Sequence, residues 1–106
     1  MNTTIMKKCV YKITFPNGKI YIGKDTRSDG HKLSYFGSWN SDLVERDLSE
    51  DECRNLILRK EILFESEDCK SVNLKESELI RKFRSYDPNI GYNRTHRSRK
   101  EMEREE

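Results

Sequence analysis

The clearest pattern along the chain is an alternation of apolar and polar positions on both sides of a turn signal near the N-terminus. Residues 8–15 (KCVYKITF) and 19–23 (KIYIG) are rich in strand-forming residues and flank the sequence Pro-Asn-Gly at 16–18, which strongly favours a turn. Alternate residues of a strand share a face. The pattern therefore predicts a β-hairpin that brings Tyr11 and Tyr21 onto paired strands and into one small patch.

The middle of the chain predicts a helix and a third strand. Ser38 or Asn40 is a suitable cap for a helix that runs to about Leu48. Residues 49–52 are typical of a turn or of another helix start. Residues 56–64 are apolar enough for a third strand, although the first of them would also continue a helix.

Apolar residues recur at helical spacing in the last third of the chain, and residues 68–86 are predicted to form the main helix. Pro88 and Gly91 are expected to stop it. The charged run 96–106 has almost no apolar anchor and reads as a frayed helix or a disordered tail. The expected buried stripe of the helix consists of Val72, Leu79, Ile80 and Phe83, with Leu74 at its edge.

The length and composition are those of one small domain with a modest core. The chain has 106 residues, and only 33% of them are hydrophobic. No window of about 18 apolar residues exists, so no transmembrane helix is expected, and residues 1–8 lack the apolar stretch of a secretory signal. The cysteines are three in number and scattered, which favours a reducing, cytoplasmic setting over a disulfide framework or a zinc site. We expect an α+β domain over residues 1–95.

The charge is nearly balanced, and its placement matters more than its sum. Basic and acidic residues number 21 and 19, whereas a dedicated DNA-binding domain is usually far more basic. An acidic stretch covers residues 42–52. The basic residues gather in and around the hairpin, where phosphate contacts are expected. These residues are Lys7, Lys8, Lys12, Lys19, Lys24 and Arg27.

Several short motifs occur in a telling order. Cys9-Val10-Tyr11 places its Tyr ten residues ahead of that of Tyr21-Ile22-Gly23, and the pair resembles the double motif of the GIY-YIG nucleases, with Cys9 in place of the first Gly. The resemblance covers nearly the whole chain, from about Cys9 to Asn93. Within the family, the chain is similar to a phage-type branch. The further segments of the resemblance are Tyr35-Phe36-Gly37-Ser38, Arg59-Lys60-Glu61-Ile62-Leu63, Glu76 four residues ahead of Ile80, and Asp87-Pro88-Asn89-Ile90-Gly91-Tyr92-Asn93.

The resemblance implies a fold and a reaction. The implied fold is a central three-stranded antiparallel sheet flanked by helices. The implied activity is a DNA endonuclease that hydrolyses phosphodiester bonds with one divalent metal, Mg²⁺ or Mn²⁺. Glu76 would hold the metal, which suits an ion that often takes only one or two carboxylates, and Glu78 is its rival. Tyr11 would act as the general base or position the water, and Tyr21 would be a supporting hydrogen-bond donor.

The resemblance leaves the cationic catalytic residue open. A guanidinium can clamp a phosphate with two parallel hydrogen bonds. Many members of the family place this Arg about ten residues after the second Tyr, where this chain has His31 and Lys32. Arg27 is the preferred candidate, with His31 as an alternative or additional phosphate contact. Asn93 matches the closing Asn of the family, whose amide would support the site.

The expected partner is DNA. The residues expected to contact it are Lys12, Lys19, Lys24, Lys32, Tyr35 and Ser38, and the aromatic Trp39 is equally suited to stack on bases or to fill the core. Either specificity is low, or it comes from loops, a second subunit or another protein. Two alternatives stay open: a catalytically degenerate relative that binds nucleic acid or protein through the same face, and a structural or regulatory interaction protein.

Overall fold

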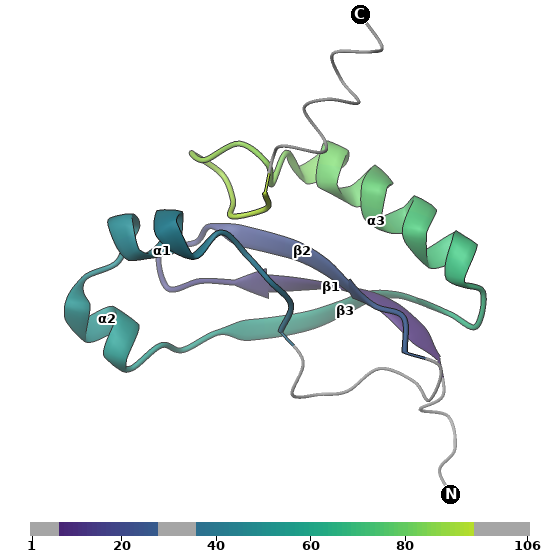
Figure 1. The fold of residues 1–106 in the computed structure, drawn as a ribbon, viewed down its shortest axis with the longest axis horizontal. Helices are drawn as coiled ribbons and strands as arrows, with labels where there is room; N and C mark the ends of the chain where they lie inside the picture. The colour runs from purple at the N-terminus through teal and green to yellow at the C-terminus, as the bar shows by residue number, and fades with distance from the viewer. Residues whose placement is uncertain (1–6, 28–35, 95–106) are drawn as a thin grey trace, which may run out of the picture.

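The structure, a computed structural model, describes residues 7–27 and 36–94 and forms a small α+β domain (Figure 1). Its three strands make one antiparallel sheet in the order β2-β1-β3. In the described ranges, no helix is long and apolar enough to cross a membrane. The elements in chain order are β1 (Lys8–Thr14), β2 (Ile20–Asp25), α1 (Ser41–Asp47), α2 (Glu50–Arg54), β3 (Arg59–Ser66) and α3 (Cys69–Phe83).

The predicted hairpin is confirmed, and its turn has the expected chemistry. The N–H of Gly18 donates to the carbonyl of Phe15 at 2.9 Å, and the N–H of Phe15 donates to the carbonyl of Lys19 at 2.9 Å. Gly18 has a φ of 89°, a conformation that most L-residues avoid. Residues 15–18 thus form a β-turn that ends in a left-handed glycine, which is the usual form of a three-residue hairpin loop.

Two capped helices fill the middle of the chain. The side chain of Asn40 accepts from the N–H of Leu43 and begins α1, as predicted. Ser49 and Glu52 form a reciprocal capping box, so the stretch at 49–52 starts a helix, α2, and is not an isolated turn. In Figure 1 both helices lie at the end of the sheet where the β1–β2 turn is found.

The third strand is shifted from its predicted range of 56–64 to Arg59–Ser66. Its start is set by β1, because the last residue of that strand, Thr14, pairs with Arg59. Leu63 has no cross-strand partner, since Val10 pairs with Phe64 and Tyr11 with Ile62. Leu63 is therefore the extra residue of a β-bulge.

The main helix is shorter than predicted. Asp68 caps its start, and Arg84 ends it in the left-handed conformation with a φ of 58° and an N–H bond to the carbonyl of Ile80. The helix therefore stops before Tyr86 and without help from Pro88. Leu74 is 72% exposed, so its expected place at the edge of the buried stripe is wrong. At about 100° per residue, it points roughly 200° away from Val72.

The two faces of the sheet bury separate apolar clusters. On one face, Val10 and Ile22 pack against Val72 of α3, together with the rest of the predicted helical stripe. The other face carries the two tyrosines of the hairpin and is covered in part by α1. We call these the α3 face and the tyrosine face.

The outer edge of β2 is closed by the segment after α3. Ile20 and Gly91 form a parallel bridge, and the N–H of Tyr92 donates to the carbonyl of Ile20 at 2.8 Å. The amide of Asn93 then bonds both backbone groups of Ile22, each at 2.8 Å. The segment at 90–93 thus continues the sheet for a few residues and leaves β2 without an open edge there.

Candidate active site

The two hairpin tyrosines meet on the tyrosine face. Tyr11 and Tyr21 have ring centroids 6.3 Å apart and ring planes tilted by 51°. Tyr21 is 8% exposed, and Tyr11 is completely buried. The expected patch of two phenols exists, and it lies inside the molecular surface.

Two glycines make room for these rings. A Cβ atom at Gly23 would lie 2.6 Å from the Tyr11 ring, and one at Gly37 would collide with the hydroxyls of both tyrosines. Gly37 also has a φ of 88°, which favours glycine. The final Gly of the Tyr21-Ile22-Gly23 motif and the Gly that follows Phe36 are therefore required by the phenol pair.

The backbone of Ser38 contacts the site, as does the side chain of a neighbouring aromatic residue. The N–H of Ser38 donates to the hydroxyl of Tyr21 at 3.1 Å. Trp39 stands edge-on to Phe15 and Tyr21, at centroid distances of 5.1 and 6.0 Å. Trp39 is partly buried and packs against the core of the tyrosine face, as the core-filling alternative expects.

A lysine of β3 completes the aromatic part of the site. The ammonium of Lys60 lies 4.6 Å from the centroid of the Tyr11 ring and 5.5 Å from that of Phe36. A cation over an aromatic face is attracted by the ring quadrupole. Burial lowers the pKa of Lys60, and the nearby Cys9 and Asp25 oppose that shift. Lys60 thus brings positive charge to the phenol pair.

A buried carboxylate lies at the end of β2 on the same face. Asp25 is only 2% exposed and accepts from the backbone N–H of Arg27 at 3.3 Å. The guanidinium Nε of Arg27 lies 3.6 Å from the same carboxylate oxygen, while the Arg27 side chain stays 42% exposed. Asp25 pairs across the sheet with Cys9. Burial, before any other cause, raises the pKa of the Cys9 thiol to about 11.

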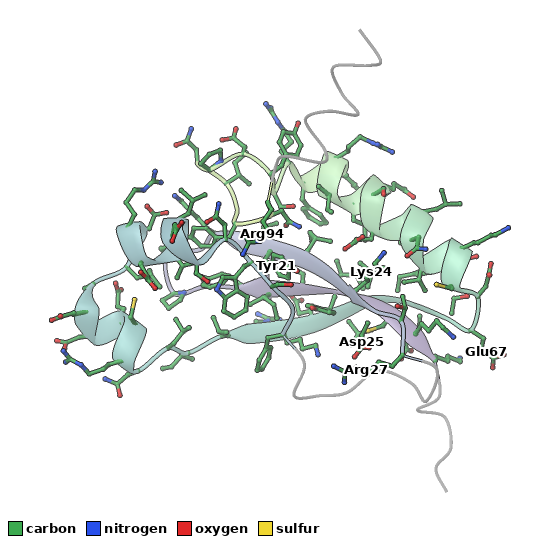
Figure 2. All side chains as sticks on the ribbon, viewed as in Figure 1. Tyr21, Lys24, Asp25, Arg27, Glu67 and Arg94 are labelled. Carbon is green, nitrogen blue, oxygen red and sulfur yellow. The ribbon has the colours of Figure 1, made fainter. Side chains whose placement is uncertain are left out.

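An open hollow of ≈ 280 Å³ lies beside this carboxylate and is lined by residues 24–27. Figure 2 shows Lys24 on the α3 side of the strand, with Asp25 and Arg27 away from it. The hollow offers an exposed guanidinium held in place by a buried acid. Such an arrangement suits an oxyanion, because the fork of an Arg matches two oxygens of a phosphate.

Sequence reasoning missed two of these polar residues. Asp25 was within reach, because it follows Tyr21 and Gly23 at alternate positions of one strand and must share their face. Lys60 was not within reach, because its place opposite Ile13 depends on the register between β1 and β3. The lysine that lies over the Tyr11 ring is therefore one that the hairpin pattern does not contain.

The predicted metal ligand approaches from the other side of the sheet. Glu76 belongs to α3, which packs on the α3 face, whereas both phenols lie on the tyrosine face. The Glu76 carboxylate lies 3.7 Å from the ammonium of Lys24, which also donates to the Asn73 side-chain oxygen at 2.6 Å. These contacts place Glu76 and the two tyrosines on opposite faces of the sheet.

The side chains at and beside Glu76 offer the type of oxygen ligand that Mg²⁺ prefers, but they offer few of them. Carboxylate and amide oxygens are ligands that Mg²⁺ accepts, and waters and phosphate oxygens often complete its shell. Within residues 7–27 and 36–94, no three His, Cys, Asp or Glu side chains gather as a metal site. A metal at Glu76 would have to replace the ammonium of Lys24, so the half-buried Glu76, with Asn73 beside it, forms a sparse site.

The expected basic cluster is dispersed over the molecule. Lys12 lies on the α3 face, 3.4 Å from Glu61 and 5.4 Å from the Phe83 ring centroid. Lys19 donates to Asp47 at 2.7 Å at the turn end of the hairpin. Together with Lys24, these residues are engaged by protein groups other than the phenols, whereas Arg27 approaches Asp25 on the tyrosine face.

The remaining candidates are a supporting residue and three that lie outside the described ranges. The side-chain amide of Asn93 bonds both backbone groups of Ile22, which lies between Tyr21 and Gly23 in β2, and its supporting role in a site stays a prediction. Predictions for His31, Lys32 and Tyr35 fall on residues 28–35, which the structure does not describe.

Comparison with protein-family models, with curated proteins and with solved structures found no match to this chain. The case for a function therefore depends on the residues themselves.

Proposed function

We propose that this protein is a metal-dependent endonuclease of the GIY-YIG type that hydrolyses DNA phosphodiester bonds. The observation that carries the proposal is the phenol pair on the tyrosine face. Tyr11 and Tyr21 lie side by side with two glycines packed against them and with the cation of Lys60 over the Tyr11 ring. A purely apolar core has no need of a buried acid and a lysine beside its aromatic rings.

Each residue of the proposed site has a task that its contacts support. The Tyr21 hydroxyl accepts from the Ser38 N–H, which orients this phenol toward the segment at 36–38, where it would donate to a phosphate oxygen or a water during the reaction. Arg27, fixed by Asp25, would bind a nonbridging phosphate oxygen from the hollow at residues 24–27. Lys60 would favour negative charge at Tyr11, because a nearby cation stabilises an anion.

The metal would be held by Glu76, with Asn73 beside it. When bound, the ion would supply charge neutralisation and a more acidic water. Glu76 would release Lys24 on metal binding, and the freed ammonium would be available to the substrate phosphate. Because Tyr11 is completely buried, a substrate would reach its hydroxyl only after the groups that cover it, Gly37 among them, have moved.

A nicking assay on supercoiled plasmid tests the proposal. We expect nicking with Mg²⁺ and none with EDTA. Tyr21→Phe and Glu76→Gln should each lower the rate by roughly 10²-fold or more, the contribution typical of a group that handles a proton or a metal. Tyr86→Phe is the matched control, because Tyr86 lies beyond α3 and outside the site. Equal rates for the Tyr21 and Tyr86 variants would reject the proposed role of the phenol pair.

The second candidate is a non-catalytic relative that binds nucleic acid through the tyrosine face. The complete burial of Tyr11 and the pairing of Glu76 with Lys24 on the opposite face favour it. This candidate predicts DNA affinity without nicking. It also predicts a log–log salt slope that flattens by about one unit for each phosphate that a variant can no longer bind. Fluorescence anisotropy of wild type and Arg27→Ala, followed across salt, measures this affinity, and the nicking assay separates the two candidates.

A further inference from the structure

The two outer strands of the sheet differ in how their edges are closed. The outer edge of β2 is occupied by the segment at 90–93, including both amide bonds of Asn93 to Ile22. Within residues 7–27 and 36–94, β3 pairs with β1 alone. In Figure 1, β3 accordingly forms one margin of the sheet. An eight-residue strand whose outer edge pairs with no other strand of the described ranges is a template for pairing with another strand.

Exposed apolar side chains gather at this edge. Ile62 and Leu63 of β3 are 39% and 37% exposed, and Ile57, two residues before the strand, is 79% exposed. Phe36 precedes α1 in the chain, is 37% exposed, and its ring lies under the ammonium of Lys60 of β3. Of the large apolar side chains that the described chain leaves exposed, only Leu74 lies elsewhere. Apolar groups concentrated in this way mark interaction surfaces.

The bulge at Leu63 decides which residues of β3 share a face. On the N-terminal side of the bulge, Lys60 lies opposite Ile13 and so belongs to the tyrosine face. On its C-terminal side, Glu65 lies opposite Cys9 and belongs to the same face. Without the extra residue, Lys60 and Glu65 would point to opposite sides, because five positions separate them. The bulge thus gives one face of β3 a lysine at one end and a glutamate at the other.

We propose that β3 is a dimerisation edge, which pairs antiparallel with β3 of a second copy about a two-fold axis between Ile62 and Leu63. Facing residues of an antiparallel pair must lie on the same side of the sheet. This register places Lys60 opposite Glu65 of the second copy, and Glu65 opposite Lys60 of the second copy. It also places Arg59 opposite Ser66 and Glu61 opposite Phe64, and the members of each of these pairs share the α3 face.

The self-complementary charges explain why a second copy is the occupant. A bulge and an edge lysine ordinarily prevent strand pairing. On this two-fold axis they do not, because the two bulges meet and each Lys60 faces a Glu65. Opposite charges that face each other across a sheet stabilise the pairing, and like charges there weaken it. Burial of Ile62 and Leu63 adds to that.

The dimer would have a consequence for the proposed function, on which this step rests. The axis is perpendicular to the sheet, so both tyrosine faces point to the same side. Adjacent strands are about 4.8 Å apart, which puts the two copies of β1 about 15 Å from one another. Two sites on one face, related by a two-fold axis, suit the two antiparallel strands of one DNA duplex. We therefore expect the dimer to cut both strands.

Sedimentation velocity over a wide concentration range tests the dimer independently of any nuclease activity. We expect the wild type to dimerise, and Lys60→Glu and Glu65→Lys each to weaken dimerisation about tenfold or more, because each creates two like-charge contacts. An equimolar mixture of the two variants should dimerise again, because every contact in the mixed dimer then joins an acid and a base. Glu45→Lys, a reversal on the exposed surface of α1, should behave as the wild type does.

Amide hydrogen exchange provides a second measurement that needs no variant. Exchange of residues 59–66 in the wild type should slow as protein concentration rises, while exchange in α1 should not change. A wild type that stays monomeric at every concentration overturns the proposal, and so do two folded variants whose mixture stays monomeric. A dimer whose β3 amides exchange as fast as those of the monomer would also reject the β3 edge. If the dimer forms and no DNA is cut, the nuclease proposal fails and the interface stands.

Discussion

The two faces of the sheet are built on different principles. On the α3 face, Val10 and Ile22 meet an apolar helical stripe. The charged side chains near it, such as Lys12 and Glu76, stay partly exposed. On the tyrosine face, the same strands carry two phenols and, beside them, a fully shielded carboxylate and a buried thiol at Asp25 and Cys9. The α3 face is what packing alone requires.

The difference between the two faces indicates which residues tolerate substitution. Apolar surfaces accept other side chains of similar volume, whereas a buried polar cluster depends on each member. The tyrosine face also depends on the absence of side-chain atoms at Gly23 and Gly37. Substitutions on this face should therefore have the larger effects, and four predictions test this.

Gly37→Ala should have the largest effect. The left-handed φ costs about 1–2 kcal/mol for a residue with a Cβ, and the collision with Tyr11 and Tyr21 adds roughly 1–3 kcal/mol of overpacking. We expect a loss of about 3 kcal/mol or more in the free energy of unfolding, measured with urea. Gly18→Ala is the matched control, since Gly18 has nearly the same φ but open space around it. Losses of equal size would mean that the collision does not matter.

Val72→Ala should cost about 2 kcal/mol, because it empties part of the α3-face cluster. It should leave the tyrosine face intact, so the near-ultraviolet circular dichroism of Tyr and Trp in the native state should not change. A changed aromatic spectrum would show that the two faces are coupled more tightly than their separate clusters indicate.

Asp47→Asn should cost roughly 1–1.5 kcal/mol at neutral pH. Asp47 accepts from Lys19 at 2.7 Å, from Arg46 at 2.9 Å and from the Tyr92 hydroxyl at 2.9 Å, and so ties α1 to the turn and to the closing segment. The bond from Lys19, followed by the bond from Arg46, holds the pKa of this carboxyl well below its ordinary value of 3.8.

A depressed pKa in the folded state means that the folded protein binds fewer protons than the unfolded chain. The stability that Asp47 contributes is therefore complete above its ordinary pKa of 3.8 and is lost as the pH falls through the folded pKa. The difference in the free energy of unfolding between wild type and variant should be constant from neutral pH down to about 3.8 and should shrink as the pH falls further. A difference that persists unchanged in strong acid would contradict the charge-based explanation.

Leu74→Lys should have the smallest effect, within about 0.5 kcal/mol, because this side chain already faces solvent on α3. Thermal melts of this variant and of Val72→Ala compare two sides of one helix. A large loss at Leu74 would mean that something covers this side of α3.

The hairpin and its shared face could be predicted from the sequence because they depend on neighbours along the chain. The period of two and the Pro-Asn-Gly turn place Tyr11 and Tyr21 on one side without any knowledge of the remaining fold. By the same reasoning, Lys12 points away from Tyr11, so closeness in sequence was a poor guide to a common basic surface.

The side on which α3 packs could not be predicted in this way. Both faces of β1 are apolar, with Val10 on one and Ile13 on the other, so the pattern does not choose between them. That choice decides whether Glu76 meets the phenols. The place of Lys60 likewise depends on a register between strands far apart in the chain, and the bulge at Leu63 shifts that register by one residue.

The closure of β2 by Asn93 has a consequence for how the protein is made. The two residues that share these amide bonds, Ile22 and Asn93, are 71 positions apart in the chain. Synthesis proceeds from the N-terminus at roughly 5–20 residues per second. The hairpin therefore leaves the ribosome several seconds before the residue that completes its edge has been joined to the chain. A nascent chain arrested before residue 93 should expose β2 to chaperones, and release of the last segment should end that exposure.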